Sequence, residues 1–521
     1  NAAGPHAKQS EWMRRVAKVG LLVLLLVGLP LLGLVVIGQP LDRYLEFPPQ
    51  TRYVQQPPFS WMVFSALALL IVVSVVPFTV RMATSRVTPH GNGRAVHTFP
   101  WWGWLGAALT AASWVLAWNR FTWLEPLQAF TFTPLWIGYI LFVNAYTFKR
   151  TRRCMMLGRP RYFLWLFPLS AAFWWFFEYL NRFVQNWYYL GVQEFTPWEY
   201  VLHATVPFST VLPAVLGTVE LLSSYPRIGA GLDQLPPFRS THVKMAGWVI
   251  LVCASAGLIG IGIWPSYLFP LVWVAPLLVI TSLQMVTGEE TIFSRIPRGD
   301  WTALWSSALA ALVCGVLWEM WNYKSLSHWQ YAIPFVHRFQ VFEMPLLGYA
   351  GYFPFGLECM AVAQFFFPES FQEMTLRPSQ TRSWTRKEDY RMVRRIGCGL
   401  LVVGILLSAG HGSAQLEMDP SLVPKGFLSG KDWRGLSKGE QQAYAVGVID
   451  GLDLAFAQGK QGIDLGWINA CVTGMSSEQV RAMLKAEIDA NPAELNQLTV
   501  HQAMYRALKK SCRKGPEKKL H

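Results

Sequence analysis

Long apolar runs, separated by short polar stretches, dominate the first three quarters of the chain. A helix needs about 20 apolar residues to cross the hydrocarbon core of a bilayer. The pattern predicts an all-α polytopic membrane bundle of ten spans, with an eleventh apolar segment after it. The apolar runs are 19–38, 59–80, 99–118, 134–147, 162–181, 200–223, 246–264, 267–284, 302–322, 346–367 and 396–413.

A short motif at the end of one apolar run returns 141 residues later at the end of another. The matching positions are Glu178, Asn181, Trp187 and Tyr188 in the first copy, and Glu319, Asn322, Trp329 and Tyr331 in the second. We therefore predict a tandem duplication in which 99–245 and 246–391 each hold four spans, after two further spans in 1–98. An even number of spans makes the two copies parallel, as in some transporter halves.

Composition and charge agree with a membrane protein. Hydrophobic residues make up 52% of the chain and charged residues 15%, outside the usual soluble range. The net charge is +14, but Lys and Arg gather in loops on one side, for example 149–161, as the positive-inside rule describes. We expect a bacterial inner-membrane protein with a cytoplasmic N-terminus, lipid contacts and no nucleic-acid partner.

Residues 392–414 have a basic start, an apolar centre and a small-residue end, which is the pattern of a secretory signal peptide. Two interpretations stay open. The segment is an eleventh span within one natural polypeptide, or 1–391 and 392–521 are two neighbouring gene products read as one chain. Both interpretations place 415–521 in the periplasm.

The exported region 415–521 carries three capping-box patterns, at Ser437–Glu440, Ser476–Gln479 and Thr499–Gln502, so we predict three helices that start there. Its two cysteines, Cys471 and Cys512, predict a disulfide in an oxidising compartment. Closing that loop of about 42 residues contributes about 4 kcal/mol in the chain-entropy model.

Four short motifs stand out in this region, Ala443–Gly451, Cys471, Asn491–Leu495 and Cys512. Together they resemble those of the Tai family of periplasmic immunity proteins, which neutralise type VI secretion amidases. The resemblance implies a small helical periplasmic domain that binds another protein. Residues 1–391 resemble only uncharacterised bacterial polytopic membrane proteins, and no activity follows from that likeness.

The repeated Glu-x-x-Asn motif is the leading candidate site. Residues three apart share a helical face, so each copy offers a carboxyl and an amide side by side near the outer end of a span. Two such pairs, with Trp187, Tyr188, Trp329 and Tyr331 above them, are predicted to converge if the copies pack symmetrically. The site would bind a cation, shuttle a proton or act as acid and base. The alternative is that each Glu only fixes a helix end.

A second pair of acidic residues, Glu220 and Glu358, lies in spans that are rich in Pro and Gly. Such spans are tolerated where a helix lines a cavity, so both residues are further candidates for substrate binding. No compact His or Cys ligand set, phosphate loop, dinucleotide fingerprint or serine-hydrolase elbow occurs. We therefore predict no metal and no cofactor.

Three hypotheses follow. The leading one is a protein that binds or moves a lipid-like or amphipathic small molecule in a Trp-lined cavity between the copies, with a periplasmic protein-binding domain. The first alternative is an integral-membrane enzyme acting on a lipid or isoprenoid. The second is a membrane-anchored interaction or immunity protein.

Overall fold

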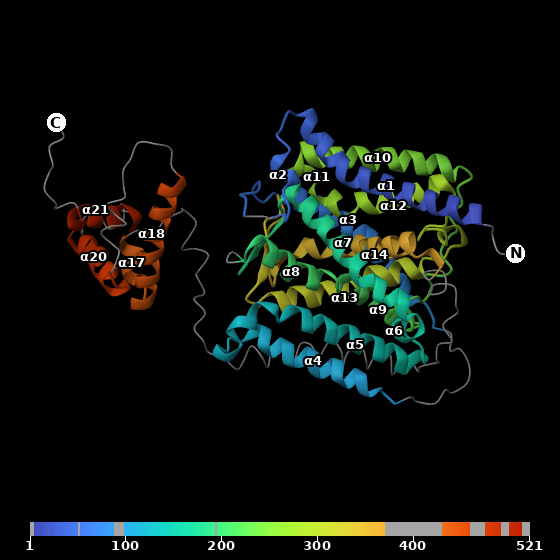
Figure 1. The fold of residues 1–521 in the computed structure, drawn as a ribbon, viewed down its shortest axis with the longest axis horizontal. Coiled ribbons are helices and arrows are strands. Elements are labelled where there is room, and N and C mark those ends of the chain that lie inside the picture. Colours follow the sequence, from blue (N-terminus) through green and yellow to red (C-terminus); the bar gives the residue numbers. More distant parts are fainter. Residues whose placement is uncertain are drawn as a thin grey trace. The chain divides into compact units, whose positions relative to one another are not determined.

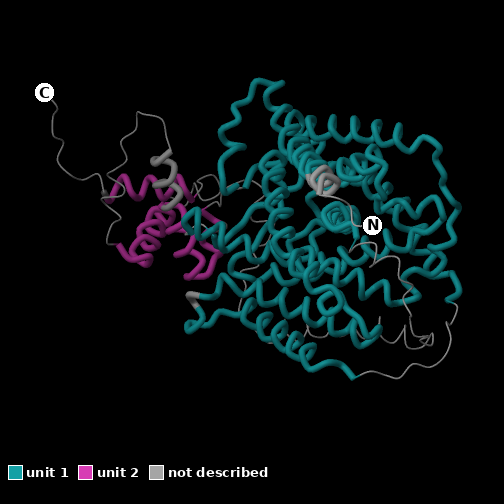
Figure 2. The backbone as a smooth tube through the Cα atoms, turned by 45° about the vertical axis from the view of Figure 1, so that its right-hand side comes forward, with its two compact units in different colours: residues 1–394 teal, residues 395–521 magenta. Residues whose placement is uncertain are grey.

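The computed structural model describes residues 5–49, 53–87, 98–192, 195–369, 430–458, 475–490 and 500–512. The described chain is mostly helical, with four short strands (Figure 1). It divides into two compact units, residues 1–394 and 395–521 (Figure 2). The apolar segment 396–413, predicted as an eleventh span or signal peptide, lies outside the described residues.

The first unit follows the order of apolar runs in the sequence. Its elements up to residue 223 are α1 (Pro5–Val36), α2 (Asp42–Leu45), α3 (Trp61–Thr84), α4 (Trp101–Trp118), η1 (Thr122–Phe130), α5 (Phe132–Thr151), α6 (Met155–Gly158), α7 (Pro160–Val184), β1 (Trp187–Leu190), α8 (Pro197–Phe208) and α9 (Val211–Ser223). The remaining elements are α10 (Val243–Ile263), α11 (Pro265–Leu268), η2 (Phe269–Trp273), α12 (Ala275–Thr287), η3 (Ile296–Arg298), α13 (Thr302–Asn322), β2 (His328–Tyr331), β3 (Gln340–Val341), β4 (Met344–Pro345), η4 (Leu346–Gly351) and α14 (Tyr352–Phe366).

Among the described residues, eight helical segments are long and apolar enough to cross a membrane, or nine if one bent pair is counted as a span. The sequence predicted ten in this region. The difference is α4, an 18-residue helix at the predicted place whose many tryptophans lower its hydropathy. Tryptophan favours the membrane interface over the hydrocarbon core.

Two of the predicted spans are broken helices. The run 200–223 forms α8 and α9, which are separated at Ser209–Thr210 directly after Pro207. The run 267–284 bends by 54° between η2 and α12. Pro213, in the first turn of α9, has no backbone N–H and so cannot donate to the carbonyl of Ser209 at the break. Broken helices inside a bundle are tolerated where protein or a cavity covers the freed backbone groups.

The helices of the first unit pack side by side in one bundle. Helices α4 and α5 form one edge and α1, α10 and α12 the opposite edge, with α7, α9, α13 and α14 between them (Figure 1). Close crossings at the two edges depend on glycine pairs. A Cβ on Gly106 would lie 2.7 Å from the carbonyl oxygen of Gly138, and one on Gly33 2.1 Å from that of Ile259. Small residues allow such backbone approach between helices.

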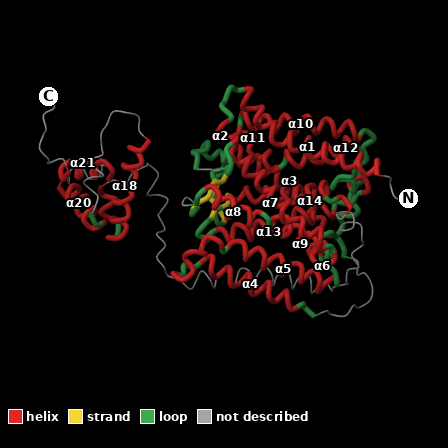
Figure 3. Tube along the Cα trace, viewed as in Figure 1, coloured by secondary structure: helices red, strands yellow, loops and turns green. Residues whose placement is uncertain are grey.

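A two-stranded antiparallel sheet joins the ends of α7 and α13. Strand β1 follows α7, strand β2 follows α13, and Trp187 pairs with Tyr331 while Tyr189 pairs with Trp329. The strands lie together at the α8 end of the unit (Figure 3). Because the two strands pair, the carboxyl ends of α7 and α13 lie at the same end of the bundle.

The second unit contains a small helical core. Its described helices are α17 (Gly430–Gly435), α18 (Lys438–Gln458), α20 (Ser477–Ala490) and α21 (Val500–Cys512). Capping boxes at Ser437 and Ser476 are confirmed by reciprocal hydrogen bonds with Glu440 and Gln479. The third pattern begins at a residue outside the described ranges. The predicted disulfide also involves such a residue, Cys471.

Candidate functional site

Glu178 on α7 is completely buried and is surrounded by aromatic donors. Its Oε1 accepts three hydrogen bonds, from the Trp174 indole at 3.2 Å, the Trp187 indole at 3.0 Å and the Tyr189 hydroxyl at 2.6 Å. Trp174 is one helical turn before Glu178, and the other two donors project from β1. The carboxyl group therefore ties the end of α7 to the strand that follows it.

Glu319 on α13 has a similar surrounding in the second half. Its Oε1 accepts from the hydroxyls of Tyr331 and Tyr352, each at 2.7 Å. The Trp329 indole donates to the Tyr331 hydroxyl at 2.8 Å. In both halves a Trp and a Tyr two residues apart on a strand serve one buried carboxyl. Alternate residues of a strand share one face, which explains the spacing.

The two asparagines bond backbone groups, whereas the sequence predicted that each would stand beside a Glu at a binding site. Asn181 Oδ1 accepts from the backbone N–H of Asn186 at 2.8 Å, and its Nδ2 donates to the Trp187 carbonyl at 2.7 Å. Asn322 makes the same pair of contacts with Trp329, at 2.8 and 2.7 Å. An amide side chain holds both a donor and an acceptor, so each Asn satisfies backbone groups at the start of a strand. Neither lines a cavity.

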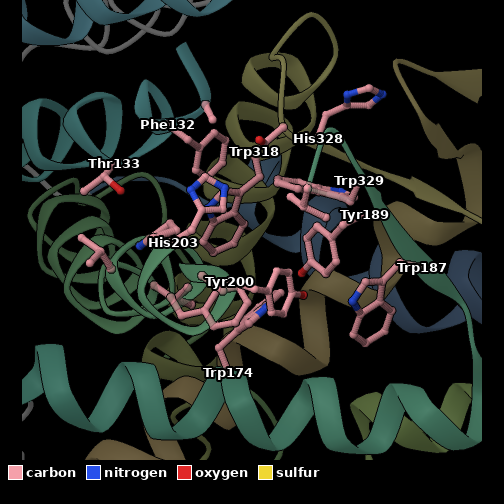
Figure 4. Close-up of a pocket in the computed structure, with 18 of the residues that line it drawn as sticks. Phe132, Thr133, Trp174, Trp187, Tyr189, Tyr200, His203, Trp318, His328 and Trp329 are labelled. Carbon is pink, nitrogen blue, oxygen red and sulfur yellow. The ribbon is translucent and has the colours of Figure 1, made fainter. Parts of the chain in front are cut away.

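A cavity of about 380 Å³ is lined by residues from both 99–245 and 246–391. Its volume falls in the range of small-molecule sites. The rings that donate to the two carboxyl groups all face it, and Figure 4 shows several of them around the space. These rings are Trp174, Trp187, Tyr189, Tyr331 and Tyr352, and Trp329, which donates to Tyr331, faces the cavity as well. Further lining rings come from Tyr200, Trp273 and Trp318.

The cavity reaches the outside of the bundle between η1 and α8. Phe130, Leu202 and Val206 line it there, and their side chains are 46, 68 and 51% exposed. His203 on α8 lines the same region, between the rings of Phe130 and Phe195. These exposed apolar side chains lie on η1 and on α8, and α8 belongs to a candidate span.

The structure brings together only some of the predicted site residues. Trp187, Trp329 and Tyr331 line the cavity, whereas Glu178 and Glu319 lie behind these rings as their hydrogen-bond partners. The Asn side chains turn to the backbone instead of standing beside the Glu carboxyl groups at the cavity.

Tyr188 was predicted at the site and Tyr189 was missed. The Tyr188 hydroxyl donates to Gln330 at 2.8 Å on the other face of the two-stranded sheet, while Tyr189 faces the cavity. The sequence held the signal for the correct residue, because a Trp-x-Tyr pattern occurs in both strands. His203 and Tyr200 carried no motif and become visible only through the packing of α8.

Glu220 and Glu358, the second predicted pair, lie away from the cavity. Glu220 Oε2 accepts from the backbone N–H of Met155 at 2.7 Å and thereby caps the short helix α6. Glu358 is fully buried in α14, and neither of its carboxyl oxygens has a hydrogen-bond partner. The sequence suggested that these two residues are equivalent, but their contacts differ.

Outside the spans, three titratable groups next to the site have displaced pKa values. Burial raises the pKa of Tyr189 and of Tyr331, and the neighbouring carboxyl groups of Glu178 and Glu319 add to the effect. Burial also raises the pKa of Glu343, which His328 partly opposes. Both tyrosines therefore stay protonated and keep donating at neutral pH. Among the described residues, no group of three His, Cys, Asp or Glu side chains is placed to hold a metal ion.

These features define the class of the first unit, a helical bundle of candidate membrane-spanning helices with an aromatic cavity that reaches the surface between η1 and α8. Comparisons with models of protein families, with curated proteins and with solved structures find no match to this chain.

Proposed function

We propose that the first unit binds, and moves across or along the bilayer, an amphipathic small molecule with an apolar chain. The observation that carries the proposal is the cavity itself, which is lined mainly by apolar and aromatic side chains and includes the exposed Leu202 and Val206 of a candidate span at its rim. Few polar groups at fixed positions in an apolar pocket are typical of small-molecule sites. The site residues are the lining rings, with the two carboxyl groups as their supports.

The enzyme alternative has less support. A general acid or base has to reach the reacting atoms within hydrogen-bond distance. Glu178 and Glu319 lie behind the aromatic lining, and each is already bonded to that lining through one oxygen. The membrane-inserted arrangement with a cytoplasmic N-terminus and an exported second unit remains part of the proposal. So does descent of the two halves from a duplicated four-helix unit, which the matching Glu, Asn, Trp and Tyr contacts favour.

For the second unit we propose binding of another protein in the periplasm, as the Tai resemblance implies. All four of its described helices contribute to a core that includes Trp433, Ile449, Leu484 and Leu508. This unit has its own core and its own capping boxes, so the binding role can be tested separately from the cavity.

The cavity proposal is tested by photolabelling. The full chain in dodecyl maltoside is exposed to a single-chain amphiphile that carries a diazirine at the end of its chain, and labelled peptides are mapped by mass spectrometry. We expect labels on η1 and α8, competed by the unlabelled amphiphile. Labels spread over all lipid-facing helices without competition would refute the proposal.

A variant that fills the cavity with a larger side chain tests whether the ligand occupies that space. Ala204 is 6% exposed and lines the cavity, so Ala204→Phe places a ring in the space that the ligand would occupy. Labelling of α8 should fall about tenfold, the change expected for a loss of about 1.4 kcal/mol. Leu69→Phe on the exposed face of α3 serves as the control and should leave the labelling of α8 unchanged.

A further inference from the structure

Buried carboxyl groups, with no Lys or Arg side chain to balance them, stand behind the described wall of the cavity. Two fully buried carboxyl groups stand directly behind it, Glu178 and Glu319, and each bonds to lining rings through one oxygen. The second oxygen, Oε2, has no hydrogen-bond partner in either residue. None of the described lining residues is Lys or Arg. The ion pairs found among the described residues involve neither carboxyl group.

A buried carboxylate without a cationic partner is costly, and a positive charge nearby offsets that cost. The protein supplies no such charge at the described lining. A cation inside the cavity would face rings that are hydrogen-bonded to the two carboxyl groups.

The rings themselves favour a cation. The faces of Trp and Tyr attract positive charge, and the effect grows when water is excluded. Hydrogen bonds polarise the groups that make them, so an indole or phenol that donates to a carboxylate becomes a better π-face. Trp174, Trp187 and Tyr189 donate to Glu178, and Tyr331 and Tyr352 donate to Glu319.

We propose that the ligand is a cationic amphiphile whose head is a substituted ammonium without N–H hydrogens, held in this aromatic cage. The inference rests on the proposed function, since it names the chemical class of the molecule that the cavity takes. The apolar chain leaves through the opening between η1 and α8, past Leu202 and Val206.

A fully substituted ammonium fits better than a primary one. An –NH₃⁺ group needs three acceptors, and a buried donor without a partner is costly. The carboxyl oxygens, which are the strongest acceptors near the cavity, lie behind the rings and outside the lining. A trimethylammonium head needs no acceptor and presents methyl groups to the ring faces, which is the usual manner of recognition in aromatic cages.

The test compares three competitors of the photolabel on the full chain at pH 7.5. The first is the octyl ether of choline. The second is the octyl ether of 3,3-dimethylbutanol, which has carbon in place of the charged nitrogen and the same shape. The third is octyl sulfate.

We expect the choline ether to displace the label from α8 at a concentration about tenfold or more below that of the neutral ether, and octyl sulfate to be the weakest. Glu178→Gln should abolish the preference for the cation while the neutral ether still competes. Glu358→Gln, which removes a buried carboxyl group away from the cavity, is the matched control and should keep the preference.

Equal competition by the choline ether and the neutral ether would overturn the cation inference and leave the amphiphile proposal standing. No specific labelling, or no displacement by any of the three, would overturn the proposed function as well. If Glu178→Gln does not fold, Glu319→Gln takes its place, and the comparison on the unmodified chain decides in either case.

Discussion

Single buried side chains fix the geometry of this site through their hydrogen-bonding chemistry. Asn181 and Asn322 each satisfy backbone groups of the residues that start a strand, and so place a Trp and a Tyr next to a buried Glu. The sequence pointed to these positions because an ionisable residue and an amide near the end of an apolar run are unusual. It could not tell whether the amide faces a ligand or the backbone, since both uses have the same spacing.

Removing this anchor should be costly. Asn181→Ala leaves the N–H of Asn186 and the carbonyl of Trp187 buried without partners, at about 1–3 kcal/mol for each group. We expect the midpoint temperature of thermal unfolding to fall clearly. Tryptophan fluorescence during heating is the measurement.

Asn119→Ala is the control, because that side chain bonds only the Val115 carbonyl of its own helix. It should change the stability by no more than about 0.5 kcal/mol. Equal midpoints for the two variants would contradict the role assigned to Asn181.

At the scale of elements, apolar periodicity predicted where helices occur, and glycine decides how closely some of them pack. In α1, Gly33 lies against the backbone of α10 beside Gly262, whereas Gly20 has nothing near its missing Cβ. The sequence shows both glycines in one apolar run and gives no reason to separate them. Only the crossing of two helices distinguishes the required glycine from the dispensable one.

This contrast gives a matched pair of variants. Gly33→Ala places a methyl group 2.1 Å from the Ile259 carbonyl oxygen, so α1 and α10 must separate. Overpacking of this kind costs about 1–3 kcal/mol. Gly20→Ala meets no atom and replaces Gly by a better helix former, so it should be neutral or slightly stabilising. Thermal unfolding of both in the same detergent is the measurement, and a fall for Gly20→Ala alone would reverse the assignment.

For the whole molecule, the distribution of charge predicts how the chain inserts. Lys and Arg in 149–161 predict a cytoplasmic loop under the positive-inside rule, and the eleven apolar runs of the sequence predict an exported second unit. The common direction of α7 and α13, whose following strands pair with each other, agrees with parallel halves.

Reporter fusions test the insertion. Alkaline phosphatase, which needs its disulfides and so folds only in an oxidising compartment, should be active when fused after His521 and inactive when fused to a chain cut within 149–161. On a gel, the fusion after His521 should run as one polypeptide with the mass of the whole chain plus the reporter. Activity of the shorter fusion alone would show the opposite topology. A second, shorter product from the fusion after His521 would favour two separate gene products.

The sequence by itself determined the apolar runs, the positions of most helices, the capped starts in the second unit and the place of the site at the ends of two spans. These follow from local chemistry, namely hydrophobicity over about 20 residues and side-chain capping of neighbouring backbone groups. The tertiary structure alone decided which side chains face the cavity. Tyr189 replaces Tyr188, both Glu side chains stand behind the aromatic lining, and His203 joins from α8. Strand pairing and helix crossing set those directions, and both depend on residues far apart in the chain.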